Sequence, residues 1–310
     1  MTDKTYRLIT RADFDGVVCG ALLSEKGLTK NVMFAHPRDV QDGKVPVTGD
    51  DVIANLPYVA AAHICFDHHI SESYRVDGEP ENLVLDVRAP STARVIYEHF
   101  GGRNTFSEID TDLLGAVDKA DAAEYSIEEV LTPEGWTLLN FVLDPRTGLD
   151  DFQEFDLDRH TFMAELIQFC RRNPVKEILA HPDVVDRIAA YQLNNEFAEL
   201  QIERCAEVHG KTVVVDYRRE EKRFPGNRFM VYGLFPQCDI SIKVQNLQDD
   251  GLVEIALGKS IIDRSCPVNV GELMLKYGGG GHAAAGTCRA PDADADDMIR
   301  EIIDAIEASR

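Results

Sequence analysis

Carboxylate and imidazole side chains gather in two short segments near the start of the chain. Asp13 and Asp15 are two residues apart in an acidic turn, and Asp67, His68 and His69 are consecutive. Carboxylates combined with imidazoles suit a first-row divalent ion such as manganese, and the same donors suit iron, cobalt or zinc. An Asp-x-Asp spacing is also common in ordinary turns, and a histidine pair also occurs in structural settings. The pattern indicates a metal site, and a purely structural role for these residues is the alternative.

A second group of chemical interest is a glycine run near the other end of the chain. It consists of Gly278, Gly279, Gly280 and Gly281, followed by His282, three alanines and Gly286. A backbone without side chains lets a ligand approach closely and offers N–H groups to an anion. We expect the small residues after the glycines to start a helix whose N-terminus favours negative charge, and His282 to contact a phosphate or base. A flexible hinge is the alternative interpretation.

Short apolar strands that alternate with helices must position the first group. The acidic turn directly follows one expected strand, and the Asp67–His69 segment ends another. This alternation predicts an α/β fold with a parallel sheet and helices on both faces, where ligands bind outside the carboxyl ends of the strands. We expect strands at 6–10, 31–35, 63–66 and 83–85, and a helix over 93–100 that Ser91 or Thr92 caps.

The rest of the chain indicates a second, smaller domain. Residues 112 to 208 have a mainly helical pattern, and strand patterns return at 212–215, 229–232, 240–244 and 253–257. The length of 310 residues fits about two domains. We therefore expect a catalytic domain with a helical extension over 1–185, a linker helix over 186–209 and a smaller α/β domain over 210–310. Helical faces within 150–208 are candidates for pairing two chains as a homodimer.

The composition excludes several classes of protein. The chain has 32 basic and 54 acidic side chains, a formal charge of −22, which argues against binding to long duplex nucleic acid because that binding draws on a basic surface. Short or small phosphorylated ligands stay compatible with this charge. No stretch approaches the ~20 apolar residues that cross a bilayer. Seven scattered cysteines argue against disulfides and structural zinc. We expect a cytoplasmic protein without a membrane partner.

Together the motifs resemble those of the DHH phosphoesterases that carry a C-terminal DHHA1 domain. The resemblance rests on Asp13-Phe14-Asp15-Gly16, on Asp67-His68-His69 and on the late glycine run, and it spans nearly the whole chain. This family includes manganese-dependent exonucleases, nanoRNases, nucleoside bisphosphate phosphatases, cyclic-dinucleotide phosphodiesterases and exopolyphosphatases. The resemblance implies a parallel-sheet DHH domain that a linker helix joins to a smaller α/β DHHA1 domain.

The resemblance also implies roles for individual residues. In the catalytic group, Asp67 orients the histidines beside it and His69 contacts the scissile phosphate. The fourth metal-ligating motif supplies Asp118, with Asp121 three residues on as the competitor, and the sequence does not separate the two because residues three apart share a helix face. The implied metal ligands are Asp13, Asp15, His68 and one of these two aspartates. The implied substrate-binding residues are Gly279, Gly280, Gly281 and His282. Lys259 and Arg264 precede the glycine run and are candidates for binding the distal phosphate or base of the substrate, although they are equally explained as an exposed basic turn.

Two positions depart from the family pattern. Arg11 stands in the place of a leading histidine; a guanidinium cannot ligate a metal, but it suits a substrate phosphate. Asn55 falls where an aspartate normally bridges two metals, with Asp50 and Asp51 as nearby alternatives. We therefore expect one or two ions, Mn²⁺ or another divalent metal. The sharper hypothesis is one metal, with Arg11 in place of the other.

The resulting prediction is a metal-dependent phosphohydrolase. It would cleave a phosphodiester or phosphoanhydride in a short oligonucleotide, a nucleotide or polyphosphate, with the metal lowering the pKa of water. The alternative is a degenerate family member that binds a nucleotide or phosphate without efficient turnover. The presence of all five residues of the first group favours the enzyme.

Overall fold

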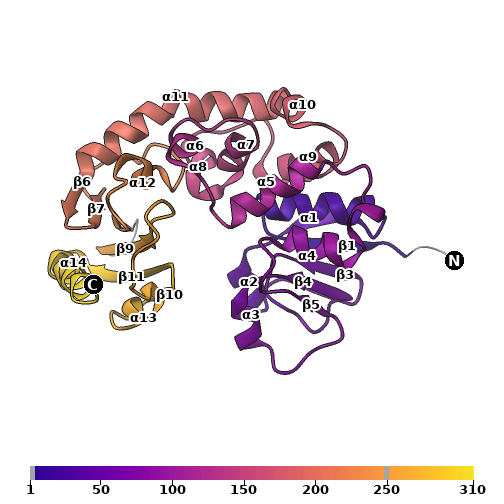
Figure 1. Ribbon diagram of the computed structural model, residues 1–310, viewed down its shortest axis with the longest axis horizontal. Helices are drawn as coiled ribbons and strands as arrows, with labels where there is room; N and C mark the ends of the chain where they lie inside the picture. The colour runs from indigo at the N-terminus through magenta and orange to yellow at the C-terminus, as the bar shows by residue number, and fades with distance from the viewer. Residues whose placement is uncertain (1–3, 248–250) are drawn as a thin grey trace. The chain divides into compact units, whose positions relative to one another are not determined.

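The computed structural model describes residues 4–247 and 251–310 (Figure 1). The chain forms two compact units. Unit 1 extends to Glu124 and continues over Glu134–Ala190, and unit 2 consists of Tyr125–Pro133 and Tyr191–Arg310. Helix α11 (Pro182–Cys205) carries the chain from the first unit into the second.

Over the described residues, unit 1 is built on a five-stranded parallel sheet with the order β2-β1-β3-β4-β5. Its strands are β1 (Tyr6–Thr10), β2 (Thr29–Phe34), β3 (Asp51–Ala54), β4 (Ile64–Asp67) and β5 (Leu83–Leu85). The chain direction across the sheet reverses between β1 and β3. The carboxyl ends of these two strands therefore form a topological switch point, where open α/β sheets bind ligands.

Helices cover both faces of this sheet (Figure 1). Helices α1, α4, α5 and α9 pack against one another on one side. On the other side, Val40 of α2 and Leu56 bury Ile9, Ile53 and Cys65 of the sheet. The helical segments of unit 1 are α1 (Phe14–Glu25), α2 (Pro37–Gln41), α3 (Ile70–Arg75), α4 (Thr92–His99), η1 (Gly102–Asn104), α5 (Thr111–Asp121), α7 (Gly135–Leu143), η2 (Pro145–Thr147), α8 (Leu149–Phe152), α9 (Arg159–Cys170) and α10 (Val175–Leu179).

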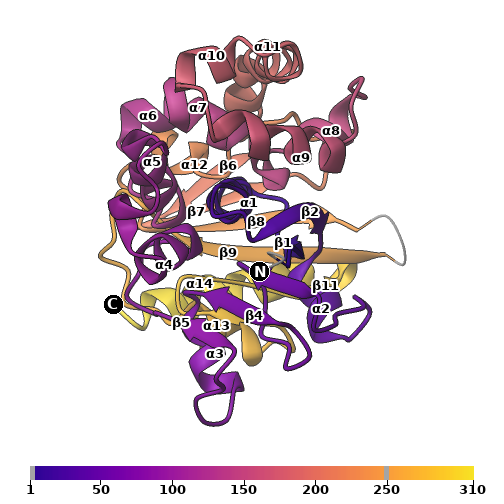
Figure 2. The same cartoon turned by 90° about the vertical axis from the view of Figure 1, so that its right-hand side faces the viewer.

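Unit 2 has a mixed sheet, six-stranded within the described ranges, with the order β10-β11-β9-β8-β7-β6, and several of its strands run side by side in Figure 2. Among the strand pairs of this sheet that the structure describes, only β7 and β8 are parallel. Ile242 and Ile255 on one face of the sheet share a buried core with Met274 and Ile302. The strands and helices are β6 (Ala206–His209), β7 (Thr212–Asp216), β8 (Ile240–Asn246), β9 (Leu252–Lys259), β10 (Gly280–His282), β11 (Ala285–Pro291), α6 (Ile127–Leu131), α12 (Met230–Leu234), α13 (Val270–Leu275) and α14 (Asp292–Glu307).

The α/β fold expected from the sequence is confirmed, and two local expectations are wrong. Residues 229–232 do not form a strand; Met230 begins helix α12, because a four-residue apolar run is buried equally well in either element. The alanines after the glycine run do not start a helix, since Ala285 begins strand β11. Among the helices that the structure describes, none is long and apolar enough to cross a membrane.

Candidate active site

Arg11, Asp13 and Asn55 meet at the switch point of the parallel sheet. Asp13 caps α1 and accepts a hydrogen bond from Gly16 N at 3.0 Å. Asn55 follows β3 and donates from Nδ2 to the same carboxylate oxygen at 3.0 Å, while Arg11 Nε lies 3.0 Å from the other oxygen. Burial raises the pKa of Asp13, and the charge of Arg11 opposes that rise. Protein donors thus contact both oxygens of Asp13.

Asp15 lies in the first turn of α1 and is only 3% exposed. Its carboxylate accepts hydrogen bonds from the backbone N–H groups of Thr92 (3.0 Å) and Ala93 (2.9 Å), at the N-terminus of α4. Burial raises the pKa of Asp15 to about 7, together with the negative charges of Asp121 and Asp13. The side chain is held by two N–H groups and retains lone pairs for a cation.

His68 and Asp121 complete a group around Asp15. One carboxylate oxygen each from Asp15 and Asp121 and one ring nitrogen of His68 lie within 4.8 Å of one another. His68 Nδ1 is 3.1 Å from the carbonyl oxygen of Ala89, which orients the ring. His68 Nε2 lies 2.8 Å from Asp121 Oδ2, at ion-pair distance. Burial disfavours the charged ring, but the Asp121 and Asp15 carboxylates outweigh it and raise the pKa of His68 to about 9.

These three residues fit a divalent metal ion. The contact between His68 Nε2 and Asp121 lacks the alignment of a hydrogen bond, so Nε2 is buried without a hydrogen-bond partner among the described residues. Asn55 Oδ1 is likewise buried without a hydrogen-bond partner among the described residues. Two carboxylates and one imidazole form a donor set that divalent first-row metals favour. A cation in contact with Nε2 would supply the partner that the protein does not.

Asp67 and His69 form a hydrogen-bonded pair beside this group. Asp67 is 2% exposed, and its Oδ1 lies 2.7 Å from His69 Nδ1. The same oxygen accepts from the backbone N–H of His68 at 2.8 Å. Asp67 therefore fixes the position of both histidines, and His69, with 42% of its side chain exposed, keeps Nε2 on the far side of its ring.

The structure separates Asp118 from Asp121, which the sequence could not. Asp118 accepts a hydrogen bond from Ser91 Oγ at 2.7 Å and pairs with Arg94 through Nε (3.0 Å) and Nη2 (2.5 Å). It joins α5 to the start of α4 and is not a member of the group that contains Asp121.

Arg146 is a site residue that sequence reasoning missed. It follows Pro145 in η2, and its guanidinium Nε is 2.7 Å from Asp144 Oδ1. Burial lowers the pKa of Arg146, but the charges of Asp144, Asp13 and Asp121 outweigh this and raise it. The interactions with Asp13 and Asp121 place a second arginine beside the acidic group. No motif signals this, because the arginine comes from a loop far along the chain.

The expected substrate-binding residues lie in unit 2. Gly280, Gly281 and His282 form β10, which pairs with β11, and a side chain at Gly279 would come within 2.0 Å of the carbonyl oxygen of Thr287. The backbone N–H of Lys259 donates to Ala284 O at 2.8 Å, so this lysine lies beside the hairpin between β10 and β11. Arg264 is in the following turn, where Nε donates to Ile261 O at 3.2 Å.

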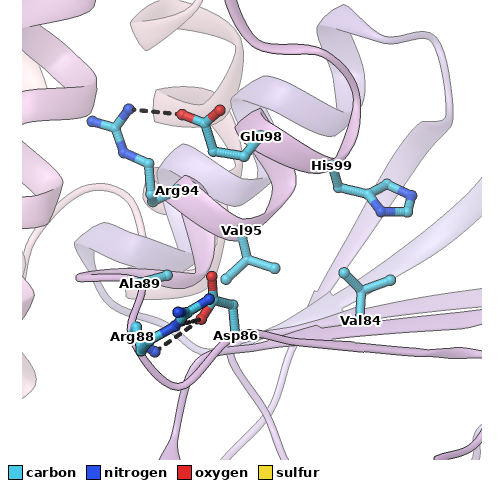
Figure 3. Close-up of a pocket in the computed structure, with 8 residues that line it drawn as sticks. All are labelled: Val84, Asp86, Arg88, Ala89, Arg94, Val95, Glu98 and His99. Atoms are coloured by element: carbon cyan, nitrogen blue, oxygen red, sulfur yellow. Dashed lines mark hydrogen bonds and ion pairs between the residues drawn. The ribbon is translucent and has the colours of Figure 1, made fainter.

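A pocket of about 480 Å³ opens beside α4 in unit 1 (Figure 3). Its charged side chains pair with each other, Arg88 with Asp86 and Arg94 with Glu98. Ala89 lines it and also supplies the carbonyl oxygen that contacts His68. The pocket thus adjoins the metal-binding group, although its lining contains none of the residues that the sequence analysis proposed for the site.

Comparison with solved structures finds close similarity to one enzyme. A pGpG-specific phosphodiesterase, PggH from Vibrio cholerae, is 45% identical, with a TM-score of 0.89, over 99% of this chain and 100% of that one. Two distant structures share the fold. RecJ from Thermus thermophilus with Mn²⁺ is 13% identical (TM-score 0.54, 99% of this chain and 52% of that one). CDC45 from Entamoeba histolytica is 8% identical (TM-score 0.53, 98% and 95%). No family model and no curated protein matches.

A parallel sheet with carboxylates and histidines at its switch point, in a chain so similar to a phosphodiesterase, defines a metal-dependent phosphohydrolase. The enzyme interpretation is therefore confirmed over that of a binding protein without turnover. More particularly, the chain belongs to the DHH family of phosphoesterases.

Proposed function

We propose that this enzyme hydrolyses pGpG, a linear dinucleotide with a 5′-phosphate, to two molecules of GMP. The observation that carries the proposal is 45% identity to a pGpG-specific phosphodiesterase over essentially the full length of both chains. In this reaction water adds to the bridging phosphorus and the bond from phosphorus to the 3′-oxygen breaks. The net charge of −22 agrees with a small substrate rather than a long duplex.

The proposed site holds one divalent metal ion, which we take to be Mn²⁺. Asp15, His68 and Asp121 would be its protein ligands. When bound, such an ion lowers the pKa of water and neutralises charge on phosphoryl oxygens. Asp13 has Arg11, Asn55 and Gly16 as partners, which supports the hypothesis that the Arg11 cation stands where a second ion would bind.

The remaining residues would bind and orient the scissile phosphate. Asp67 holds His69 Nδ1, so the ring presents Nε2 to a phosphate oxygen. Arg11 and Arg146 provide positive charge beside Asp13, and arginine binds phosphate through paired N–H donors. In unit 2, the hairpin from Gly280 to Ala285, with Lys259 beside it, is the proposed substrate-binding segment.

The proposal also includes a cytoplasmic location. All seven cysteines are free, which agrees with a reducing compartment. Cell fractionation followed by immunoblotting tests this point, and recovery of the protein in a membrane or extracellular fraction would contradict it.

A substrate panel with defined metals tests the proposed reaction. The purified chain, stripped with EDTA and reloaded with Mn²⁺, Mg²⁺ or Zn²⁺, is given pGpG, pApA, 3′-phosphoadenosine phosphate, a cyclic dinucleotide and polyphosphate. We expect GMP from pGpG at the highest kcat/KM, no product in EDTA, and the best recovery with Mn²⁺. Asp15→Asn should abolish turnover, whereas Asp39→Asn, a control at a side chain that is 47% exposed, should not. A higher kcat/KM for another substrate would refute the pGpG assignment.

A further inference from the structure

Lys243 occupies an unusual position in the sheet of unit 2. It lies in β8, which has β7 on one side and β9 on the other. Because side chains alternate along a strand, the burial of Ile242 and Val244 in the core directs Lys243 to the opposite face. Lys243 is half-buried, and no residue within the described ranges forms a hydrogen bond or ion pair with its ammonium group.

The charges around Lys243 do not compensate for the burial of its ammonium group. Burial and, to a smaller extent, the like charge of Arg223 together lower the pKa of Lys243 to about 8, against the opposing effect of Glu254. Glu254 accepts a hydrogen bond from Gln245 at 2.9 Å. A half-buried ammonium beside another cation is unfavourable without an acceptor, and this occurs in a chain with 54 acidic residues.

The strand register places Lys243 in one row with the glycine strand. Lys243 is paired with Ala256, Ala256 with Thr287, and Thr287 with Gly280, so these residues share the face opposite the core. Between Lys243 and the exposed Thr287 stands only the small side chain of Ala256. At about 4.8 Å per strand, their Cα atoms are roughly 10 Å apart.

On the same face of the sheet, a tyrosine side chain covers the neighbouring row of residues and so marks where the row of Lys243 begins. Tyr232 of α12 covers Ser241 and Gly258, with its hydroxyl 2.8 Å from Ser241 Oγ and 2.7 Å from Gly258 O. A side chain at Gly258 would lie 2.9 Å from the same hydroxyl. The row that contains Lys243 is two residues further along each strand, beyond Tyr232.

We propose that Lys243 and Thr287 bind the terminal 5′-phosphate of the dinucleotide substrate. The inference rests on the proposed function for the ligand, a 5′-phosphorylated dinucleotide, and names the residues that recognise its end. A terminal phosphate carries more charge than the bridging one, and an ammonium together with a hydroxyl supplies donors to it. This contact would select substrates with a 5′-phosphate over those with a free 5′-hydroxyl.

The test compares the binding of two ligands that cannot be cleaved. Analogues of pGpG and GpG with a methylene in place of the bridging ester oxygen are titrated calorimetrically into the metal-loaded, full-length chain. We expect the parent to bind the phosphorylated analogue about tenfold more tightly, as for one charge-assisted contact. Lys243→Met should reduce this ratio to near one, Lys243→Arg should retain part of it, and Lys211→Met, which removes the same charge at an exposed position, should leave it unchanged.

Each outcome decides the inference. Since Met replaces an unpaired ammonium with an apolar side chain of similar length, the melting temperature of Lys243→Met should equal or exceed that of the parent, which separates lost binding from misfolding. A parent without preference for the phosphorylated analogue, or a Lys243→Met variant with the parental ratio, would overturn the assignment. If the parent shows the ratio and its loss in the variant but does not cleave pGpG, the proposed function fails and the phosphate contact stands.

Discussion

Arg11 changes the chemistry of the site at the scale of a single residue. Its Nε lies 3.0 Å from Asp13, whose other oxygen accepts a hydrogen bond from Asn55. The guanidinium therefore gives Asp13 a cationic partner within the protein itself. A second metal beside Arg11 would face like charge at short range.

Restoring the metal-binding residue types at these positions should therefore add a second ion. For Arg11→His combined with Asn55→Asp, we expect elemental analysis to find about two Mn²⁺ per chain, against one for the parent. Asn55 has φ +56°, a backbone region that Asp also tolerates, so the fold should persist. Arg88→His, at a side chain 90% exposed, is the control. An unchanged metal content and turnover in the double variant would contradict the one-metal hypothesis.

Metal binding should depend strongly on pH. In the metal-free protein the pKa of His68 is raised to about 9 and that of Asp15 to about 7. Below pH 9 the ring is protonated, so a metal must displace a proton, and below pH 7 a second proton opposes binding. We expect the apparent affinity to rise up to about tenfold per pH unit from pH 7 towards 9, and more steeply below pH 7. Calorimetry in buffers of different ionisation enthalpy should detect proton release; affinity independent of pH from 6.5 to 8.5 would contradict the prediction.

At the scale of elements, two aspartates on α5 should have different roles. Asp118 ties α5 to α4 through Ser91 and Arg94, whereas Asp121 faces His68. We expect Asp118→Asn to destabilise the fold by about 1–2 kcal/mol, because Arg94 loses its charged partner, while metal binding persists. Asp121→Asn should lower metal affinity and turnover by at least tenfold and leave the melting temperature nearly unchanged. Thermal melts and metal titrations check both variants, and the reverse assignment of effects would contradict the geometry.

In unit 2, two adjacent glycines should have different roles: Gly279 should matter for the stability of the fold, and Gly280 for substrate binding. A Cβ at Gly279 would lie 2.0 Å from Thr287 O, while a Cβ at Gly280 has no atom within 4 Å. Gly279→Ala should therefore cost about 1–3 kcal/mol of stability, seen as a lower melting temperature. Gly280→Ala should melt like the parent but raise KM for pGpG if the substrate approaches this backbone. Equal melting temperatures for both variants would refute the steric argument.

Local patterns predicted those elements whose boundaries have chemical markers. Strands over 6–10 and 83–85 and the helix capped by Ser91 agree with the structure, because apolar runs and a capping residue mark them. The sequence pattern does not predict strand β3, because β3 is a run of four residues with an acidic start, and it predicts a strand where the structure has helix α12. Within the site, the order of the family motifs predicts that Asp15 and His68 lie close together. The choice of Asp121 over Asp118 depends on helix phase, and the approach of Arg146 depends on a long-range loop, so neither could be predicted.

At the scale of the whole molecule, net charge should govern which nucleic acids bind. With a charge of −22, the protein should bind long duplexes more weakly than about 10⁻⁴ M at physiological salt. A mobility-shift assay with duplex DNA and RNA checks this, with fluorescent pGpG as the positive control. Micromolar duplex binding would contradict the expectation.

The homodimer expected from the helical region also stays a prediction, which light scattering of the full-length chain would check.

Unit 2 is assembled from two stretches of chain, and this has a consequence for biosynthesis. Helix α6 belongs to unit 2, where Asn227 Nδ2 donates to Val130 O at 2.9 Å across 97 residues of sequence, and Gly233 packs against Leu131. The ribosome therefore releases α6 before its partner exists. At usual translation rates the apolar side of α6 waits roughly 5–20 seconds for α12 to be made. The nascent enzyme can therefore complete unit 2 only late in synthesis, after α12 has been made.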